Sequence, residues 1–309
     1  MILVSPVANA NNIELKEDQI DKTIKLDTNV IIEKRVDGRV VPVENSQNLT
    51  DDQLNSILLQ MNISEERIND MLRSQKEFLV SQGGISVDVE TSNLKRYFQT
   101  SDGKKHLVTD FNKEKIEELK QTEMKKLNLE SDKSNNVTPF AMGSDGSGSF
   151  NGYSSLMYMG KSPNAAEFTY AYEDNWSFNQ SVSQKFTDKI AHAWQSHTTS
   201  VGHSGAYSWY VINSWGNKTL EFSTGGTVSG RIGSFTQPTG VFSESKGYMA
   251  DIVRIPVTNV NTTGKWSTKY THPWTLITPS INIGVLSLTI STFVGDLWEW
   301  ENSFIIKAY

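Results

Sequence analysis

The chain contains no cysteine among its 309 residues, and it has only five histidines. The absence of cysteine excludes a disulfide scaffold, a thiolate zinc site and a cysteine nucleophile together. Five scattered histidines leave few further ligands for a metal ion. We therefore expect no metal and no cofactor, so any chemistry must come from oxygen atoms, histidines or aromatic rings.

An excess of basic residues is also missing. Lys and Arg number 29 against 35 Asp and Glu, which gives a formal net charge of −6. A nucleic-acid-binding surface needs a basic stripe that releases counterions from phosphates, so this charge argues against a nucleic-acid partner. No run of the chain reaches the roughly 18 apolar residues of a membrane-spanning helix.

The first ten residues, MILVSPVANA, are mostly apolar and end in small residues. Ala8 and Ala10 stand at the spacing that signal peptidase recognises, although the positively charged start of a signal peptide is missing. We interpret residues 1–10 as the remnant of a secretory signal peptide; the alternative is a frayed cytosolic N-terminus. The lack of cysteine favours export, so we expect a secreted, extracellular protein.

Charged and aromatic residues divide the chain into two regions. Residues 1–140 hold 43 of the 64 charged residues, whereas all eight tryptophans and nine of the ten tyrosines lie after residue 140. Between them, residues 131–149 are rich in Ser, Asn and Gly and cannot bury much apolar surface. We predict a charged α+β domain at 11–135, a linker at 131–149 and a second domain at 150–309.

Two hairpins are predicted in the first region, because Asp37-Gly38 and Asp102-Gly103 each separate two strand-like runs. Thr50 and Gln53 have capping-box spacing at the start of an amphipathic helix.

A second helix is expected after Ser64, ending at Gly83-Gly84. A third, highly charged helix is expected after Asp110. It fits either a solvated structural helix or the end of a pro-region.

The second region has the pattern of an all-β domain, with short apolar or alternating runs bounded by Gly, Pro, Asn and Ser. We expect strands at 166–171, 185–197, 206–212, 219–224 and 247–257 and in the two closing segments. A β-bulge at Gly284 would join its two flanking apolar runs into one face. The predicted fold is an α+β N-terminal domain followed by an aromatic-rich antiparallel β-sandwich.

The candidate catalytic residues fit ordinary structural roles better than catalysis. Gly202–Ala206, GHSGA, resembles a nucleophile elbow but lies between strand-like segments, so a hairpin turn is expected there. On one strand, His192 and His197 would point to opposite faces and could not converge on a metal without a bulge. Glu299 and Glu301 share one face of a strand and could serve a glycoside hydrolase, the less favoured hypothesis.

The aromatic content of the second region indicates binding instead. Tryptophan and tyrosine suit a core and also a surface that grips sugar, protein or lipid headgroups. The candidate binding residues are Trp298, Trp300, Trp209 and Tyr210. The closing strands could face the core, a ligand or lipid; for Trp298 and Trp300 the alternation favours the core.

The resulting hypothesis is an exported, non-enzymatic protein whose C-terminal β-sandwich binds an extracellular surface, polysaccharide or protein. The alternative is a secreted pore-forming or antibacterial toxin, with a membrane as its partner and the N-terminal domain as a mask. Its basis is a pattern of Ser/Thr-rich amphipathic strands, as in toxins that insert a hairpin.

Overall fold

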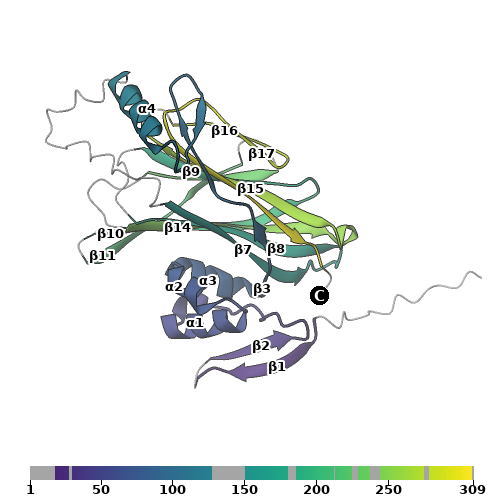
Figure 1. Cartoon of the computed structure of the whole chain (residues 1–309). Coiled ribbons are helices and arrows are strands. Elements are labelled where there is room, and N and C mark those ends of the chain that lie inside the picture. The colour runs from purple at the N-terminus through teal and green to yellow at the C-terminus, as the bar shows by residue number, and fades with distance from the viewer. Residues whose placement is uncertain are drawn as a thin grey trace, which may run out of the picture.

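The computed structural model describes residues 18–27, 30–126, 150–179, 186–211, 213–224, 229–236, 244–274 and 278–307. The predicted signal remnant at 1–10 and the predicted linker at 131–149 lie outside these residues. Most of the described chain is antiparallel β-sheet, with four α-helices among the described elements. Two large sheets face each other, and helices cover the outside of one of them (Figure 1).

The first sheet has six strands in the order β11-β10-β14-β8-β7-β3. Their bounds are β3 (Ile85–Val87), β7 (Phe150–Lys161), β8 (Glu167–Phe178), β10 (Thr199–Val211), β11 (Ser214–Thr219) and β14 (Glu244–Pro256).

The second sheet has eight strands in the order β12-β13-β9-β15-β18-β5-β6, with β4 also paired to β18. Their bounds are β4 (Glu90–Thr91), β5 (Lys95–Gln99), β6 (Lys105–Leu107), β9 (Thr187–Trp194), β12 (Glu221–Ser223), β13 (Gly230–Thr236), β15 (Thr263–Pro273) and β18 (Gly295–Ile305).

Aromatic side chains fill the space between the two sheets, because alternate residues of each strand point inward. In β8 the inward residues include Tyr170, Tyr172, Trp176 and Phe178, all at most 3% exposed. Tyr172 stacks on Trp266 of the opposite sheet, with ring centroids 4.4 Å apart. The sandwich predicted from the second region is therefore present, and its interior is largely aromatic.

Strands from the first region complete both sheets. β3 pairs with β7, and β5 pairs with β18 from Lys95↔Glu299 to Gln99↔Gly295. Residues 85–107 thus share sheets with the second region. The division of the chain into two domains at residue 135 stays a prediction. The β3–β7 and β5–β18 pairs join residues from the two sides of that predicted boundary.

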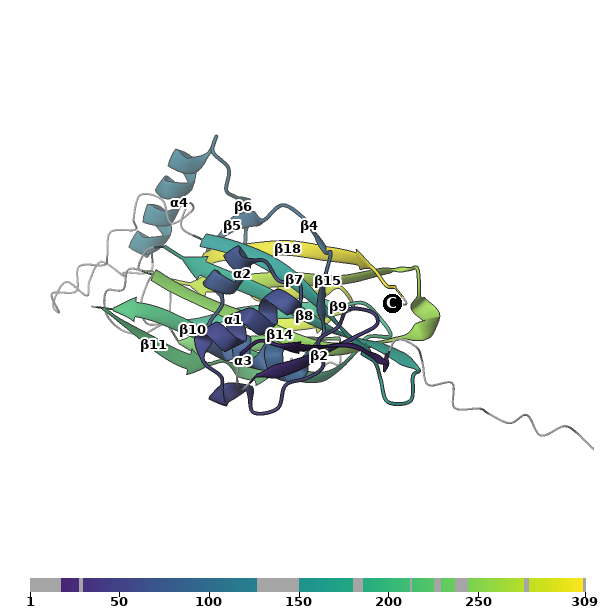
Figure 2. The same cartoon turned by 90° about the horizontal axis from the view of Figure 1, so that it is seen from below.

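A layer of three helices covers the outer face of the six-stranded sheet (Figure 2). The helices are α1 (Asp51–Gln60), α2 (Glu65–Asp70) and α3 (Arg73–Gln82), with the two-stranded sheet β1 (Ile20–Lys25) and β2 (Ile31–Arg35) beside them. Short 3-10 helices lie at Ser46–Asn48 and Val257–Asn259.

Local signals account for how these helices begin and end. Thr50 and Gln53 form the predicted capping box of α1. Ser64 accepts from the Arg67 N–H at the start of α2, and Gly83, with a positive φ of 67°, ends α3. The single helix expected between Ser64 and Gly83 is instead two helices. The Asp-Gly turns also form, with positive φ at Gly38 and Gly103.

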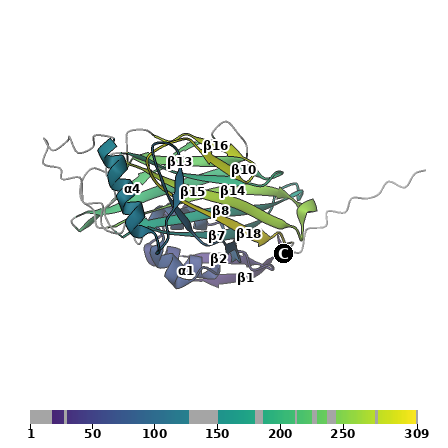
Figure 3. The ribbon, with the colours of Figure 1, turned by 45° about the horizontal axis from the view of Figure 1, so that its top comes forward.

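A fourth helix, α4 (Lys113–Lys126), lies across one end of the sandwich (Figure 3). It begins at Lys113 rather than directly after Asp110, and Ile116 donates its N–H to the Asn112 carbonyl. Ile116 packs with Phe98 of β5, with Trp274, which follows β15, and with Val294, which precedes β18. No described helix is both long enough and apolar enough to cross a membrane.

Two further sequence-based assignments were wrong. Gly284 is not a bulge: it ends β16 (Ile281–Gly284), which turns back as β17 (Ser287–Ile290) in a separate two-stranded sheet. The apolar residues change from odd-numbered to even-numbered positions because the chain reverses in a tight turn. Such a turn changes which positions face inward, as a bulge would. Gly202–Ala206 is not a turn either; it lies within the long strand β10.

Candidate functional site

The two candidate tryptophans of β18 lie in the core. Trp298 and Trp300 are each 2% exposed. The Trp298 ring stacks on Phe150, with centroids 4.3 Å apart, and the Trp300 indole N–H donates to Asp174 at 2.8 Å. Neither indole is available to a ligand in this structure, so they do not form the surface platform considered for them. The alternative of a core role, favoured by the alternation of the strand, is confirmed.

Asn302 shares this inward face and is also buried. A buried amide needs hydrogen-bond partners. Thr91 of β4 supplies one, because its hydroxyl donates to the Asn302 side-chain oxygen Oδ1 at 2.8 Å. The short strand β4 therefore provides a polar partner for the side-chain oxygen of Asn302, one of the two polar groups of this buried amide.

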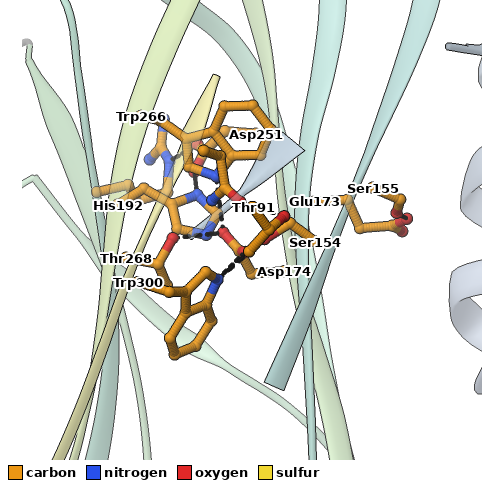
Figure 4. A network of polar contacts seen from close by, with 12 residues as sticks. Thr91, Ser154, Ser155, Glu173, Asp174, His192, Asp251, Trp266, Thr268 and Trp300 are labelled. Carbon is orange, nitrogen blue, oxygen red and sulfur yellow. Dashed lines mark hydrogen bonds and ion pairs between the residues drawn. The ribbon is translucent and has the colours of Figure 1, made fainter. Parts of the chain in front are cut away.

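The Asp174 carboxylate is the centre of a polar network between the two sheets (Figure 4). Asp174 is fully buried on β8. Trp266 and Thr268 of β15 donate to its Oδ2 at 2.9 and 2.7 Å. Trp300 and the Ser154 hydroxyl donate to its Oδ1. These donors come from both sheets, so the carboxylate joins the two layers.

His192 extends the network to a second carboxylate. Its Nε2 lies 2.8 Å from Asp174 Oδ2, and its Nδ1 lies 2.9 Å from Asp251 Oδ2. Arg231 Nε then donates to Asp251 Oδ1 at 2.5 Å. The imidazole is completely buried between two carboxylates of the six-stranded sheet.

The two acids set the charge of this histidine. Burial alone would lower the pKa of His192, but the Asp174 charge and the contacts with both carboxylates raise that pKa to about 9. Burial likewise opposes ionisation of Asp174, yet the His192 charge and the donated hydrogen bonds lower its pKa. Near neutral pH the centre thus holds a charged His192 imidazolium beside the ionised Asp174 carboxylate.

A second histidine pairs with an acid nearer the end of the sandwich. His272 Nδ1 lies 2.8 Å from Asp188 Oδ1, and the Tyr270 hydroxyl donates to Asp188 Oδ2 at 2.5 Å. Burial favours neutral His272, but the Asp188 charge outweighs burial and raises its pKa. Asp188 and His192 are inaccessible to solvent. An acid–histidine pair that substrate cannot reach is structural, so these pairs stabilise the sandwich rather than catalyse a reaction.

The carboxylates considered for glycoside hydrolysis have different surroundings. Glu299 Oε2 lies 2.8 Å from Lys269 Nζ, whereas Glu301 is exposed. Burial opposes ionisation of Glu299, but the Lys269 charge and hydrogen bond prevail and lower its pKa. A general acid needs a raised pKa, so the environment of Glu299 does not suit that role.

The other two candidates, Trp209 and Tyr210, lie where β10 turns into β11. We call Trp209, Tyr210 and Trp215, together with Lys246 of β14, the aromatic tip. Tyr210 and Trp215 are register partners with ring centroids 5.2 Å apart, and the Lys246 ammonium lies 5.3 Å from the Trp215 ring. Trp215 is 42% exposed, and the other two rings are half-buried.

The two faces of this hairpin differ. Trp209 points toward the interior, where Tyr207 lies 5.3 Å away, and it covers Gly216 so closely that a Cβ there would lie 2.4 Å from the indole. Tyr210 and Trp215 share the opposite, outer face. Glycine at position 216 therefore leaves room for the Trp209 ring on the inner face of the hairpin, while Tyr210 and Trp215 face solvent.

Comparisons with known proteins do not place the chain in a family. No family model matches it, and no curated protein matches its sequence. Among solved structures, Clostridium perfringens delta-toxin is similar over 51% of this chain and 88% of its own, at 7% identity and a TM-score of 0.26. The membrane-inserted form of the Clostridium perfringens NetB toxin aligns over 51% of this chain and 94% of its own, at 6% identity and a TM-score of 0.23.

A third solved structure is AvmM, described as catalysing macrocyclisation in alchivemycin A biosynthesis. It aligns over 46% of this chain and 81% of its own, at 10% identity and a TM-score of 0.21. TM-scores this low establish no common fold, and we draw no functional inference from these similarities.

Sequence reasoning missed the Asp174 centre and Trp215. Asp174 lies in AYEDNWSF, where an acid occupies an inward position of an aromatic strand. An acid in such a position is expected to be buried, but the hydrogen-bond donors to Asp174 are up to 126 residues away along the chain. Trp215 could have been found from Asn213, which adopts a positive φ of 64° and marks a turn between two aromatic runs.

The Asp174 centre predicts how stability depends on pH. Because folding raises the pKa of His192 to about 9, its contribution is complete below the unfolded value of about 6.5 and is lost as pH rises through about 9. Asp174, whose pKa is lowered, contributes above its unfolded value and loses that contribution as pH falls. The free energy of unfolding, measured with urea, should therefore fall as the pH rises from near neutral through about 9.

Asp174→Asn should destabilise the fold by about 3 to 5 kcal/mol, the scale for breaking a buried ion pair. It should also weaken the alkaline dependence, because His192 loses the acid that raises its pKa most. Asp21→Asn, at an exposed position of β1, is the control and should unfold like the parent. Equal stability of Asp174→Asn and the parent at pH 6 would contradict this role.

Proposed function

We propose that this is an exported, non-enzymatic protein that binds a membrane surface through its aromatic tip. The observation that supports binding there is the exposure of Trp215 beside Tyr210 and Lys246 at the end of a hydrogen-bonded strand pair. Trp and Tyr suit a lipid–water interface because the rings are amphipathic. Export is supported by the absence of cysteine and by the small-residue pattern at Ala8 and Ala10.

The tip is built to present these rings rather than to bury them. Ser208 donates its hydroxyl to the Gly216 carbonyl at 2.8 Å, and Ser214 donates to the Val211 carbonyl at 3.1 Å. These bonds fix the hairpin close to its turn. A rigid hairpin loses little conformational entropy when its rings bind, which favours affinity.

A membrane is favoured over a polysaccharide by the mixture of groups at the tip. Lys246 is a cation that can reach a lipid phosphate, while Trp215 and Tyr210 can enter the interfacial region beside it. The net charge of −6 would oppose binding to strongly anionic lipid. Zwitterionic phosphatidylcholine is therefore the appropriate test surface.

Trp215→Ala should weaken binding to phosphatidylcholine vesicles by about tenfold, the factor that corresponds to about 1.4 kcal/mol. Its melting temperature should stay near that of the parent, because Trp215 is not a core residue. Vesicle flotation measures binding, and thermal unfolding checks the fold. Ile305→Ala removes another exposed apolar side chain, at the far end of β18, and serves as the matched control.

Undiminished vesicle binding by Trp215→Ala would contradict the assignment of the tip. Absence of vesicle binding by the parent, together with retention on an insoluble polysaccharide, would replace the membrane with a sugar polymer.

A further inference from the structure

The β16–β17 hairpin has one apolar face and one polar face. Ile281, Ile283, Leu288 and Ile290 are 4–7% exposed and pack against the outside of the eight-stranded sheet. The alternate residues Asn282, Ser287 and Thr289 are exposed. Figure 1 shows the hairpin as a separate layer outside that sheet. Its alternation is that of a strand pair with one side in an apolar environment and one in water.

The hairpin is attached to the sheet mainly through side chains. Its ladder is internal, from Ile281↔Ile290 to Gly284↔Ser287, and it belongs to neither large sheet. Its apolar face lies on small residues, Ala191 and Ala193 of β9. Its contacts with the sheet include the Leu286 N–H bond to the Trp194 carbonyl at 3.2 Å. Such a unit can leave without breaking a large-sheet ladder.

The length and composition of the surrounding sequence match a membrane-crossing strand pair. From Pro273 to Gly295 the sequence contains no Asp, Glu, Lys, Arg or His. In the sequence, about ten uncharged residues lie on each side of Val285-Leu286, close to the number that a tilted strand needs to cross the hydrocarbon layer. The strands β16 and β17 themselves have four residues each. Pro279, which cannot donate a ladder hydrogen bond, lies toward the base of the first arm.

The base of the hairpin lies at the same end of the sandwich as the aromatic tip. Trp209 pairs with Ser245, and Ser245 pairs with Phe178. The Phe178 ring is 6.0 Å from that of His272, next to Pro273 where the uncharged run begins. An aromatic tip bound to a membrane would thus hold the base of the hairpin near the same surface.

Helix α4 covers this base. Ile116 packs with Trp274 and Val294, the residues that lead into and out of the hairpin. The Lys120 ammonium lies 5.0 Å from the Trp274 ring. The Trp274 N–H donates to the Val294 carbonyl at 2.8 Å, which closes the base. The helix is therefore placed to restrain movement of the hairpin.

We propose that the hairpin swings out from the eight-stranded sheet and inserts into a phosphatidylcholine bilayer, with α4 restraining it beforehand. This inference rests on the proposed membrane binding by the aromatic tip. The apolar face would exchange one apolar environment for another, while Asn282 and Thr289 would line a water-filled passage. One hairpin leaves its outer backbone groups unpaired in lipid, so several copies must pair edge to edge into a closed ring.

A reversible disulfide tests whether the hairpin must move. Ser267 donates its hydroxyl to the Leu286 carbonyl at 3.2 Å, which brings β15 next to the hairpin at these two positions. Cysteines are therefore placed there, and loss of free thiol on oxidation checks that the link forms. The natural chain has no cysteine to compete. Oxidised S267C/L286C should bind phosphatidylcholine vesicles like the parent but release no trapped dye. Reduction should restore release, and S267C alone should be insensitive to reductant.

The outcomes separate the two proposals. Loss of vesicle binding by Trp215→Ala with no dye release by the parent supports the tip and overturns insertion. Dye release by the oxidised double variant equal to that after reduction also overturns insertion. Absence of vesicle binding by the parent overturns the membrane proposal itself.

Charge at the exposed position 289 provides an independent test that does not disturb the buried face. Thr289→Glu should make the current through planar phosphatidylcholine bilayers more selective for cations, and Thr289→Lys more selective for anions, as read from the reversal potential under a salt gradient. Ser223→Glu, an exposed strand position outside the hairpin, is the control. Unchanged selectivity in both Thr289 variants would exclude this residue from the passage and overturn the assigned orientation.

Discussion

The Asp174 carboxylate holds the two sheets of this protein in one relative position. It receives hydrogen bonds from β7, β15 and β18 and an ion-pair contact from β9. Because each donor has to reach the same two oxygens, the register of every one of these strands is constrained. The large aromatic side chains then pack around a polar centre whose geometry is already set, and Trp266 and Trp300 each combine packing with a donated hydrogen bond. A buried carboxylate that lost these partners would be strongly destabilising.

The elements outside this centre are attached by fewer and more local contacts. The helical layer meets the six-stranded sheet where Gln75 donates to Glu173 and Asn175 at 2.8 Å each. Burial raises the pKa of Glu173, and the hydrogen bond that Gln75 donates opposes this rise, because it favours the ionised acid. Helix α4 and the β16–β17 hairpin rest mainly on apolar clusters. Proteins open first where tertiary contacts are few, which places the capacity for movement in these outer elements rather than in the sandwich.

Sequence reasoning succeeded where a feature depends on residues a few positions apart. The capping box at Thr50 and Gln53 and the turns at Gly38 and Gly103 are of this kind, as is the inward alternation of Trp298 and Trp300. It failed at Gly284, because the same change of phase results from a bulge or from a tight turn, and Val285-Leu286 carries no Asn-Gly or Asp-Gly signal. It could not place Asp174 beside His192, since that contact depends on how separate sheets pack. The β5–β18 pairing was equally inaccessible, because it joins regions of opposite composition.

Membrane insertion requires a fixed sandwich and a hairpin that can leave it, and amide hydrogen exchange compares the two directly. In water, amides of Ile281–Ile290 should exchange faster than those of β8 and β15, because the hairpin opens without the sheets. On phosphatidylcholine vesicles the hairpin amides should become protected, while β8 and β15 keep their slow exchange. Hairpin amides as slow as those of β15 in water and unchanged on vesicles would show that the hairpin is a permanent part of the sandwich, and would contradict the account.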